Sequence, residues 1–164
     1  MKTLKAAPVT AQSFAPYGFI ADIQNPGDAY GLGGYPVTFH RDMVLMPNAS
    51  TAPTAFGSLK IGKRPMLVQD VEYHTYACEL MMPLDDDIVI HAGPANGGEP
   101  QVDKLEAFII PKGTMVIFRA GAWHGAPFPV NHDATVLISL PERTYLNDTV
   151  KFLLEKEDYR EINL

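Results

Sequence analysis

Several classes of protein are made improbable by what this sequence lacks. Cys78 is the single cysteine among 164 residues, so an internal disulfide is excluded and a reducing compartment, the cytoplasm, is the simpler expectation. No apolar run approaches the ~20 residues that a membrane-spanning helix needs, and we expect no signal peptide in the opening segment MKTLKAAPVTAQSF. Basic residues are few, 13 against 19 acidic ones, which gives a formal net charge of −6. Nucleic acid and membrane surfaces are therefore not expected as partners.

Turn-forming residues, in contrast, are abundant. The chain holds 13 glycines and 14 prolines, which favour short strands joined by turns over a helical bundle. Strand-forming runs separated by turn residues occur at 56–61, 66–71, 76–82, 87–91, 107–110, 114–118 and 135–140. This spacing is typical of an all-β sandwich or barrel, and a barrel can enclose a ligand pocket.

The length is that of one domain, and we predict a single domain over 1–164. Its predicted parts are N-terminal strands and loops at 1–55, a barrel at 56–145 and a C-terminal helix or tail at 146–164. The first part is expected to contain a helical turn capped by Thr10, a Gly-rich loop at 25–36 and a strand at 38–45. A helix is predicted at 147–161, because Val150, Leu153 and Leu154 would share one helical face.

Two clusters carry the residues suited to chemistry. In the first, Glu72 and His74 stand two positions apart and would project to the same face of a strand. Glu79 is an odd number of residues from His74, so it reaches that face only if the chain turns or bulges at 75–77. In the second cluster, a strand at 114–118 leads through a turn at Gly121 to His124.

These clusters resemble the paired motifs of the cupin superfamily. Gly113, Gly121 and His124 follow the spacing of its second motif, with Arg119 where a proline is usual. Within the superfamily the sequence is most similar to the ureidoglycolate lyase family, at 9–27, 72–83 and 119–125. The similar stretches include VTAQSFAPYGFI, Glu72-Tyr73-His74-Thr75, Met82-Pro83 and Trp123-His124, and the departures are Tyr73 for Arg, Glu79 for Gln and Gly125 for a second His.

The resemblance implies a double-stranded β-helix (jelly-roll) barrel, short peripheral helices and a homodimer. It also implies a carbon–nitrogen lyase that cleaves ureidoglycolate, a small carboxylate, to glyoxylate and urea. Glu72, His74, Glu79 and His124 are the expected catalytic residues. For the substrate we expect contacts from Tyr73 and Trp123, and a carboxylate partner among Arg119, Arg143 and Lys63, because a guanidinium matches carboxylate geometry.

The chemistry of the cluster leaves two alternatives. His74, Glu79 and His124 would suit one divalent Mn, Fe, Co, Ni or Zn ion. Glu72 would be a fourth ligand or would support the other three without contacting the ion. Without a metal, the same groups would act as acids and bases. Glu79 also has a plainer interpretation, as an edge-strand charge that discourages aggregation.

Two other functions fit the same residues. A metal-dependent isomerase, epimerase or lyase on a sugar acid or other hydroxy acid is the second hypothesis, and a non-catalytic sensor of small ligands is the third. We place His40, His91 and His132 outside the site, with His91 structural or on the surface. Cys78 is expected to be an inert buried thiol.

Overall fold

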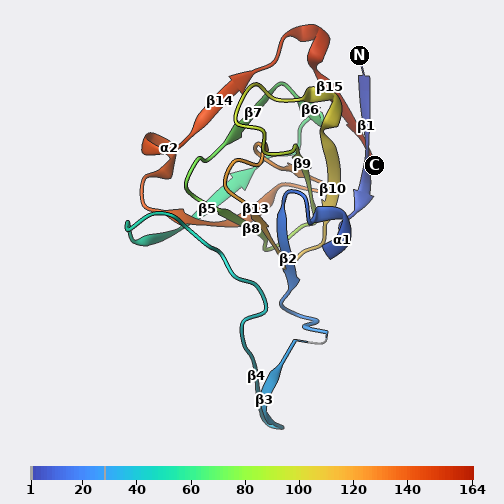
Figure 1. Ribbon diagram of the computed structural model, residues 1–164. Coiled ribbons are helices and arrows are strands. Elements are labelled where there is room, and N and C mark those ends of the chain that lie inside the picture. The colour runs from blue at the N-terminus through green and yellow to red at the C-terminus, as the bar shows by residue number, and fades with distance from the viewer. Residues whose placement is uncertain (1, 28) are drawn as a thin grey trace.

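Two curled β-sheets form the body of the protein in the computed structural model, which describes all residues except 1 and 28 (Figure 1). The six-stranded sheet has the order β12 (Phe128–Pro129), β9 (Ile88–Ala92), β10 (Glu106–Ile110), β1 (Lys2–Pro8), β15 (Arg160–Asn163) and β6 (Leu67–Val68). The five-stranded sheet has the order β2 (Gly18–Asp22), β11 (Thr114–Phe118), β8 (Glu79–Pro83), β13 (Ala134–Pro141) and β5 (Thr54–Ile61). Pairing is antiparallel except for β1, which runs parallel to β10 and β15.

One apolar core lies between the two sheets. Ile88, Ile90 and Ile110 enter it from the six-stranded sheet, and Val116 and Val136 enter it from the five-stranded sheet. A second cluster, which includes Val89 and Trp123, covers the other face of the six-stranded sheet. Because both faces of that sheet are covered, every residue of β9 is buried, as in a strand without a solvated side.

The predicted strands are present with modest changes at their ends. The prediction for 114–118 matches β11, and those near 56–61, 87–91, 107–110 and 135–140 match β5, β9, β10 and β13 within two residues at either end. The run at 66–71 divides into β6 and β7 (Asp70–Tyr73), and the run at 76–82 starts as a strand only at Glu79. The predicted cap is also confirmed: the Thr10 side chain accepts a hydrogen bond from the Ser13 N–H at the start of α1 (Ala11–Phe14).

The predicted C-terminal helix is wrong. After the single turn α2 (Thr144–Asn147), the chain forms β14 (Val150–Leu153), a 3₁₀ turn at Lys156–Asp158, and β15. Leu153, assigned to the helical apolar face, is 72% exposed, whereas Phe152 and Leu154 pack into the second apolar cluster. The apolar period in this segment is therefore two, and β14 pairs antiparallel with β7.

A β-hairpin projects from the body, at the lower end of Figure 1. It consists of β3 (Gly31–Gly34) and β4 (Val37–His40), so the predicted loop at 25–36 contains a strand and the predicted strand at 38–45 ends at His40. Tyr35 at its tip is fully exposed, and Val37 and Phe39 are mostly exposed. Among the described residues, no helix is both long and apolar enough to span a membrane.

Candidate functional site

The two predicted clusters are joined through their backbones. The Glu72 N–H donates to the His124 carbonyl at 2.7 Å, and the His124 N–H donates to the Glu72 carbonyl at 2.8 Å. The Gly121 N–H donates to the His74 carbonyl at 2.7 Å. This local ladder places β7 directly beside the segment that follows β11, so the motif residues lie together.

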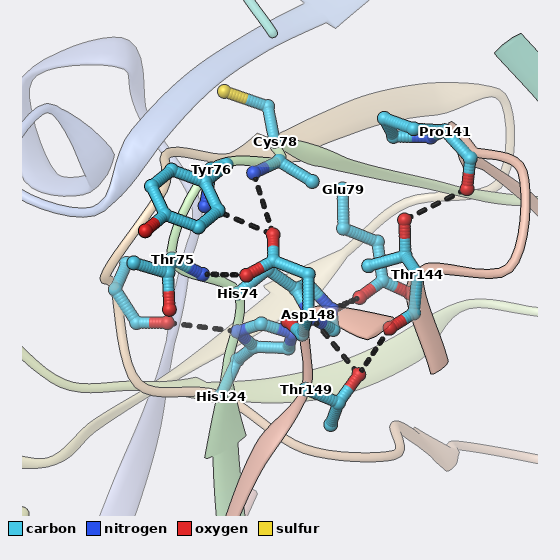
Figure 2. A network of polar contacts seen from close by, with 12 residues as sticks. His74, Thr75, Tyr76, Cys78, Glu79, His124, Pro141, Thr144, Asp148 and Thr149 are labelled. Atoms are coloured by element: carbon cyan, nitrogen blue, oxygen red, sulfur yellow. Dashed lines mark hydrogen bonds and ion pairs between the residues drawn. The ribbon is translucent and has the colours of Figure 1, made fainter. Parts of the chain in front are cut away.

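Glu79 lies between the two histidines (Figure 2). Its Oε2 atom is 2.9 Å from Nε2 of His74 and 3.0 Å from Nε2 of His124. All three side chains are at least nine-tenths buried, and the His124 ring stacks on Phe118 at a centroid distance of 4.4 Å. The edge-strand interpretation of Glu79 does not fit this position, because the carboxylate points inward.

The other ring nitrogens determine what the cluster can bind. Nδ1 of His74 faces the Asp148 carbonyl at 3.0 Å, and Nδ1 of His124 faces the Ala122 carbonyl at 2.9 Å. A carbonyl only accepts hydrogen bonds, so Nδ1 carries the proton in both rings. In the neutral rings, both Nε2 lone pairs then point at the Glu79 carboxylate. Acceptors that face one another in a buried site need a cation, either protons on the rings or a metal ion.

The pKa shifts follow from the same contacts. Burial by itself lowers the pKa of His74, but the hydrogen bond and charge of Glu79 outweigh it and raise that pKa above its ordinary value. Burial by itself raises the pKa of Glu79, but the hydrogen bonds from His124 and His74 hold it well below the usual range. The carboxylate is thus anionic, which favours a cation between the rings.

Glu72 completes the set of candidate ligands. One ligand atom from each of Glu72, His74, Glu79 and His124 lies within 4.8 Å of the others. Glu72 is half-buried, and among the described residues its carboxylate makes no hydrogen bond to either histidine. Two imidazoles and two carboxylates of this spacing match the donor set of a first-row divalent metal.

Asp148 is a residue of the site that the sequence did not indicate, and it positions the loop between His74 and Glu79 (Figure 2). Its carboxylate accepts hydrogen bonds from the backbone N–H groups of Thr75, Tyr76 and Ala77 at 2.8–3.0 Å. These contacts hold the bend that the sequence required at 75–77, which returns Glu79 to the side of His74. The carbonyl of Asp148 also orients the His74 ring. The local sequence does not indicate this role, because position 148 falls inside the helix predicted at 147–161.

A cavity of about 730 Å³ opens above the cluster. Glu72, His74 and Glu79 lie in its wall together with Arg143, Tyr145 and Lys151. Arg143 adopts a left-handed conformation, with φ of 61°. Lys151, which the sequence did not suggest, extends from β14 and contacts Asp70 with Nζ 3.0 Å from Oδ2. The cavity therefore combines a buried anionic centre with cations nearer the surface.

The other predicted substrate contacts lie elsewhere. Tyr73 alternates with Glu72 along β7, so its ring turns away and packs edge-on against Trp123 at 4.7 Å. Trp123 is buried, and its Nε1 donates to Oδ1 of Asn96 at 3.0 Å. Arg119 donates to the Ala15 carbonyl, and Lys63 donates to the carbonyls of Val130 and Asn131. Among the described residues, these four are absent from the cavity wall.

Fold and site together define a cupin-type β-barrel with a histidine–carboxylate centre. Two solved structures share this fold. A dTDP-4-dehydrorhamnose 3,5-epimerase from Bacillus anthracis has 13% sequence identity and a TM-score of 0.51, over 84% of this chain and 87% of that chain. A dTDP sugar isomerase from Desulfovibrio desulfuricans has 10% sequence identity and a TM-score of 0.51, over 87% of this chain and 89% of that chain. The model of the family described as ureidoglycolate lyase matches residues 1–159, and the chain belongs to that family.

Curated relatives agree with this assignment. A putative ureidoglycolate lyase from Agrobacterium fabrum is 25% identical over 162 residues, covering 94% of this chain and 92% of the relative. A ureidoglycolate lyase from Mesorhizobium japonicum is 26% identical over 147 residues, covering 84% and 85%. The recognition made from the motifs is therefore confirmed at the level of the family.

Proposed function

We propose that this protein cleaves ureidoglycolate to glyoxylate and urea at the His74–Glu79–His124 cluster. The observation that carries the proposal is the convergence of both motifs on one buried centre, at the base of a cavity with cations above it. In the reaction, the substrate hydroxyl loses a proton, its carbon–oxygen bond becomes a carbonyl, and the carbon–nitrogen bond breaks. The departing nitrogen takes up a proton, so the products are a neutral urea and the glyoxylate anion.

The substrate carboxylate would be held by cations in the cavity wall. Of the arginines predicted for this role, Arg143 lines the cavity, and Lys151 joins it there. A guanidinium can donate two parallel hydrogen bonds to the two oxygens of a carboxylate, while an ammonium acts as a point charge. We assign the carboxylate to Arg143, with Lys151 supporting it from β14. The other end of the substrate, where one carbon carries both the hydroxyl and the urea nitrogen, is then directed at the buried cluster.

Glu72 is the group that we assign to proton removal. It faces the cavity, and the two histidines leave its carboxylate free, whereas Glu79 is held between them. A carboxylate in this position can accept the hydroxyl proton once the substrate excludes water. Lys151 lies close enough to Glu72 for the two charges to attract each other.

We further propose that His74, His124 and Glu79 hold one divalent metal ion, with Glu72 as an additional or exchangeable ligand. The protons on both Nδ1 atoms, directed at carbonyls, leave the Nε2 atoms as ligands, which is the usual arrangement behind a metal-bound histidine. Such an ion, when bound, supplies Lewis acidity that lowers the pKa of an oxygen in the cavity.

Release of glyoxylate from ureidoglycolate, measured at high enzyme concentration, tests the activity. The wild-type protein should release it, and His74→Ala and His124→Ala should each lose on the order of 10²–10⁴ in rate, as for loss of a positioned acid–base or ligand group. His132→Ala is the matched control, because His132 is exposed and contacts the Asp133 carbonyl. Absence of glyoxylate from the wild-type reaction would contradict the proposal.

For assembly and location we propose a homodimer in the cytoplasm. An isolated two-stranded hairpin is marginal in water, and the β3–β4 hairpin presents Tyr35, Val37 and Phe39 to solvent, so we assign it to packing on a second copy. Light scattering should give a dimer for the wild type and a monomer for Phe39→Ser. Leu84→Ser, an exposed change outside the hairpin, should remain dimeric. Cys78 is the single cysteine of the sequence and has no second cysteine to pair with, which suits a reducing compartment.

A further inference from the structure

His91 is a buried polar side chain whose ring makes no well-formed hydrogen bond within the described part of the chain. It is 2% exposed, and neither Nδ1 nor Nε2 meets hydrogen-bond geometry with the described residues, while the carbonyl that lies near the ring is that of Asp70. Burial lowers the pKa of His91 to about 4, which leaves the ring neutral, with one donor and one acceptor nitrogen. A buried group of this kind costs free energy unless something satisfies it.

The ring lines a second cavity, of about 220 Å³, on the side of the six-stranded sheet away from the main core. Arg64 and Asp70 lie in the same wall, and the cavity shares Ala126 and Lys151 with the main cavity. The two cavities are thus neighbours with different linings, since Glu72, His74 and Glu79 border only the larger one.

Gly125 provides the space that the His91 ring occupies. A Cβ atom at position 125 would stand 2.9 Å from Nε2 of His91, closer than real Cβ atoms approach. A side chain at 125 would therefore displace the ring from the cavity wall. The position of the His91 ring on β9 therefore depends on glycine at position 125.

The charges of the second cavity favour an anion. The Asp70 carboxylate pairs with Lys151, with the two atoms 3.0 Å apart. The Arg64 guanidinium lies over the Phe128 ring and donates to the Pro127 carbonyl at 2.9 Å, and it lies near enough to Asp70 to interact with its charge without a salt bridge of its own. With Arg64 and Lys151 against the single carboxylate of Asp70, the wall carries a net positive charge beside a neutral ring.

We propose that this cavity is a second binding site, for a small carboxylate that also carries a hydroxyl or amide group. The carboxylate would pair with Arg64, and the hydroxyl or amide would exchange hydrogen bonds with His91. The volume limits the ligand to a few heavy atoms. The site adjoins the main cavity through Ala126 and Lys151, so its ligand would reach solvent beside the substrate of the main site.

Glycolate, which has a carboxylate and a hydroxyl, is the probe, and acetate, which lacks the hydroxyl, is the matched ligand. The ring resonances of His91 would be followed by NMR during titration of the full-length protein with each. We expect saturable shifts with glycolate and weaker binding of acetate. Arg64→Gln should weaken glycolate at least about tenfold, as expected for loss of a charge-assisted pair.

Two further variants test whether the His91 response to glycolate comes from binding in this cavity. Lys63→Gln makes the same charge change one residue away, on a side chain that contacts the carbonyls of Val130 and Asn131, and should bind glycolate as the wild type does. Arg143→Gln removes the main cavity's guanidinium and should also leave the His91 response intact. The proposed site would be overturned if glycolate did not shift the His91 resonances, or if Lys63→Gln weakened glycolate binding as much as Arg64→Gln. Loss of the His91 response in Arg143→Gln would also overturn it. Equal affinity for acetate would overturn the requirement for a donor.

Discussion

Glu72 and His124 exchange two backbone hydrogen bonds, of 2.7 and 2.8 Å, although they belong to different motifs. This pair aligns the first motif with the second, and both side chains then reach Glu79's neighbourhood. The side-chain cluster thus depends on main-chain pairing that no single motif specifies.

Glu79→Gln tests whether the centre holds a metal ion. The change keeps the shape of the side chain but removes the charge between His74 and His124. We expect near-stoichiometric divalent metal in the wild type and its loss in the variant, measured by elemental analysis. Glutamine is the residue that the resemblance gives for this position, so the change is discriminating: if the charge of Glu79 takes part in the chemistry, lyase activity should fall by about 10²-fold or more, the scale of losing a positioned catalytic group. Retained activity would show that the reaction does not need this charge.

Glu99→Gln is the matched control, since Glu99 is exposed and the chemical change is the same. It should keep both metal and activity. A wild-type protein without metal, which also fails to take up added Mn, Fe, Co, Ni or Zn, would refute the metal and leave the cluster as acid–base groups.

Asp148→Ala should damage the site without touching the substrate. Its carboxylate holds three backbone N–H groups of the 75–77 bend, so the free energy of unfolding should fall by about 2–3 kcal/mol on loss of a charged acceptor. As a positioning residue, it should affect kcat more than KM, because Glu79 and His74 lose their alignment. Urea unfolding and steady-state kinetics measure both.

Thr149→Val is the companion change. It removes the hydroxyl 3.2 Å from Nδ1 of His74 but leaves the Asp148 carboxylate in place. Its effects on stability and kcat should be clearly smaller. Equal effects of the two variants would argue against the role assigned to the bend.

Asp86 should make the stability depend on pH in the acid range. It accepts hydrogen bonds from the backbone N–H groups of Asn131 and His132 and from the Asn131 amide. Burial by itself raises the pKa of Asp86, but these hydrogen bonds lower it to about 2. The unfolded state then binds more protons below about pH 4, so this contribution is full above that pH and is lost as the pH falls toward about 2.

Urea midpoints measured across that pH range would show the slope, and Asp86→Asn should reduce it. Asp42→Asn is the control, because Asp42 is exposed and its ion pair with Arg41 is 4.0 Å long. An unchanged slope in Asp86→Asn would mean that other carboxylates carry the acid sensitivity.

Trp123→Phe distinguishes packing from substrate contact. The Trp123 ring is buried against Tyr73 and Phe152, and its Nε1–H bonds to Asn96. We expect a loss of roughly 1–3 kcal/mol in stability, as for an imperfectly filled core with one hydrogen bond removed. The KM for ureidoglycolate should change little. A large rise in KM at unchanged stability would restore the substrate role expected from the sequence.

The class of fold and the centre of the site follow from the order of the residues alone. Turn residues at short spacing predicted an all-β barrel, and alternation along a strand placed Glu72 beside His74 while requiring a bend before Glu79. These inferences succeeded because strand alternation and turn chemistry are local properties of the backbone. The motif spacing added His124 and the family.

The remaining features depend on how distant segments pack together. Val150–Leu153 is ambiguous between a helix and a strand when read alone, and pairing with β7 made it a strand that brings Lys151 to the cavity. Asp148 holds a bend far from it in the chain. The His91 ring occupies space that Gly125 leaves open, and it shares a cavity wall with Arg64. These relationships depend on contacts between distant segments, because the free energy of burial and pairing is set by neighbours that the local sequence does not contain.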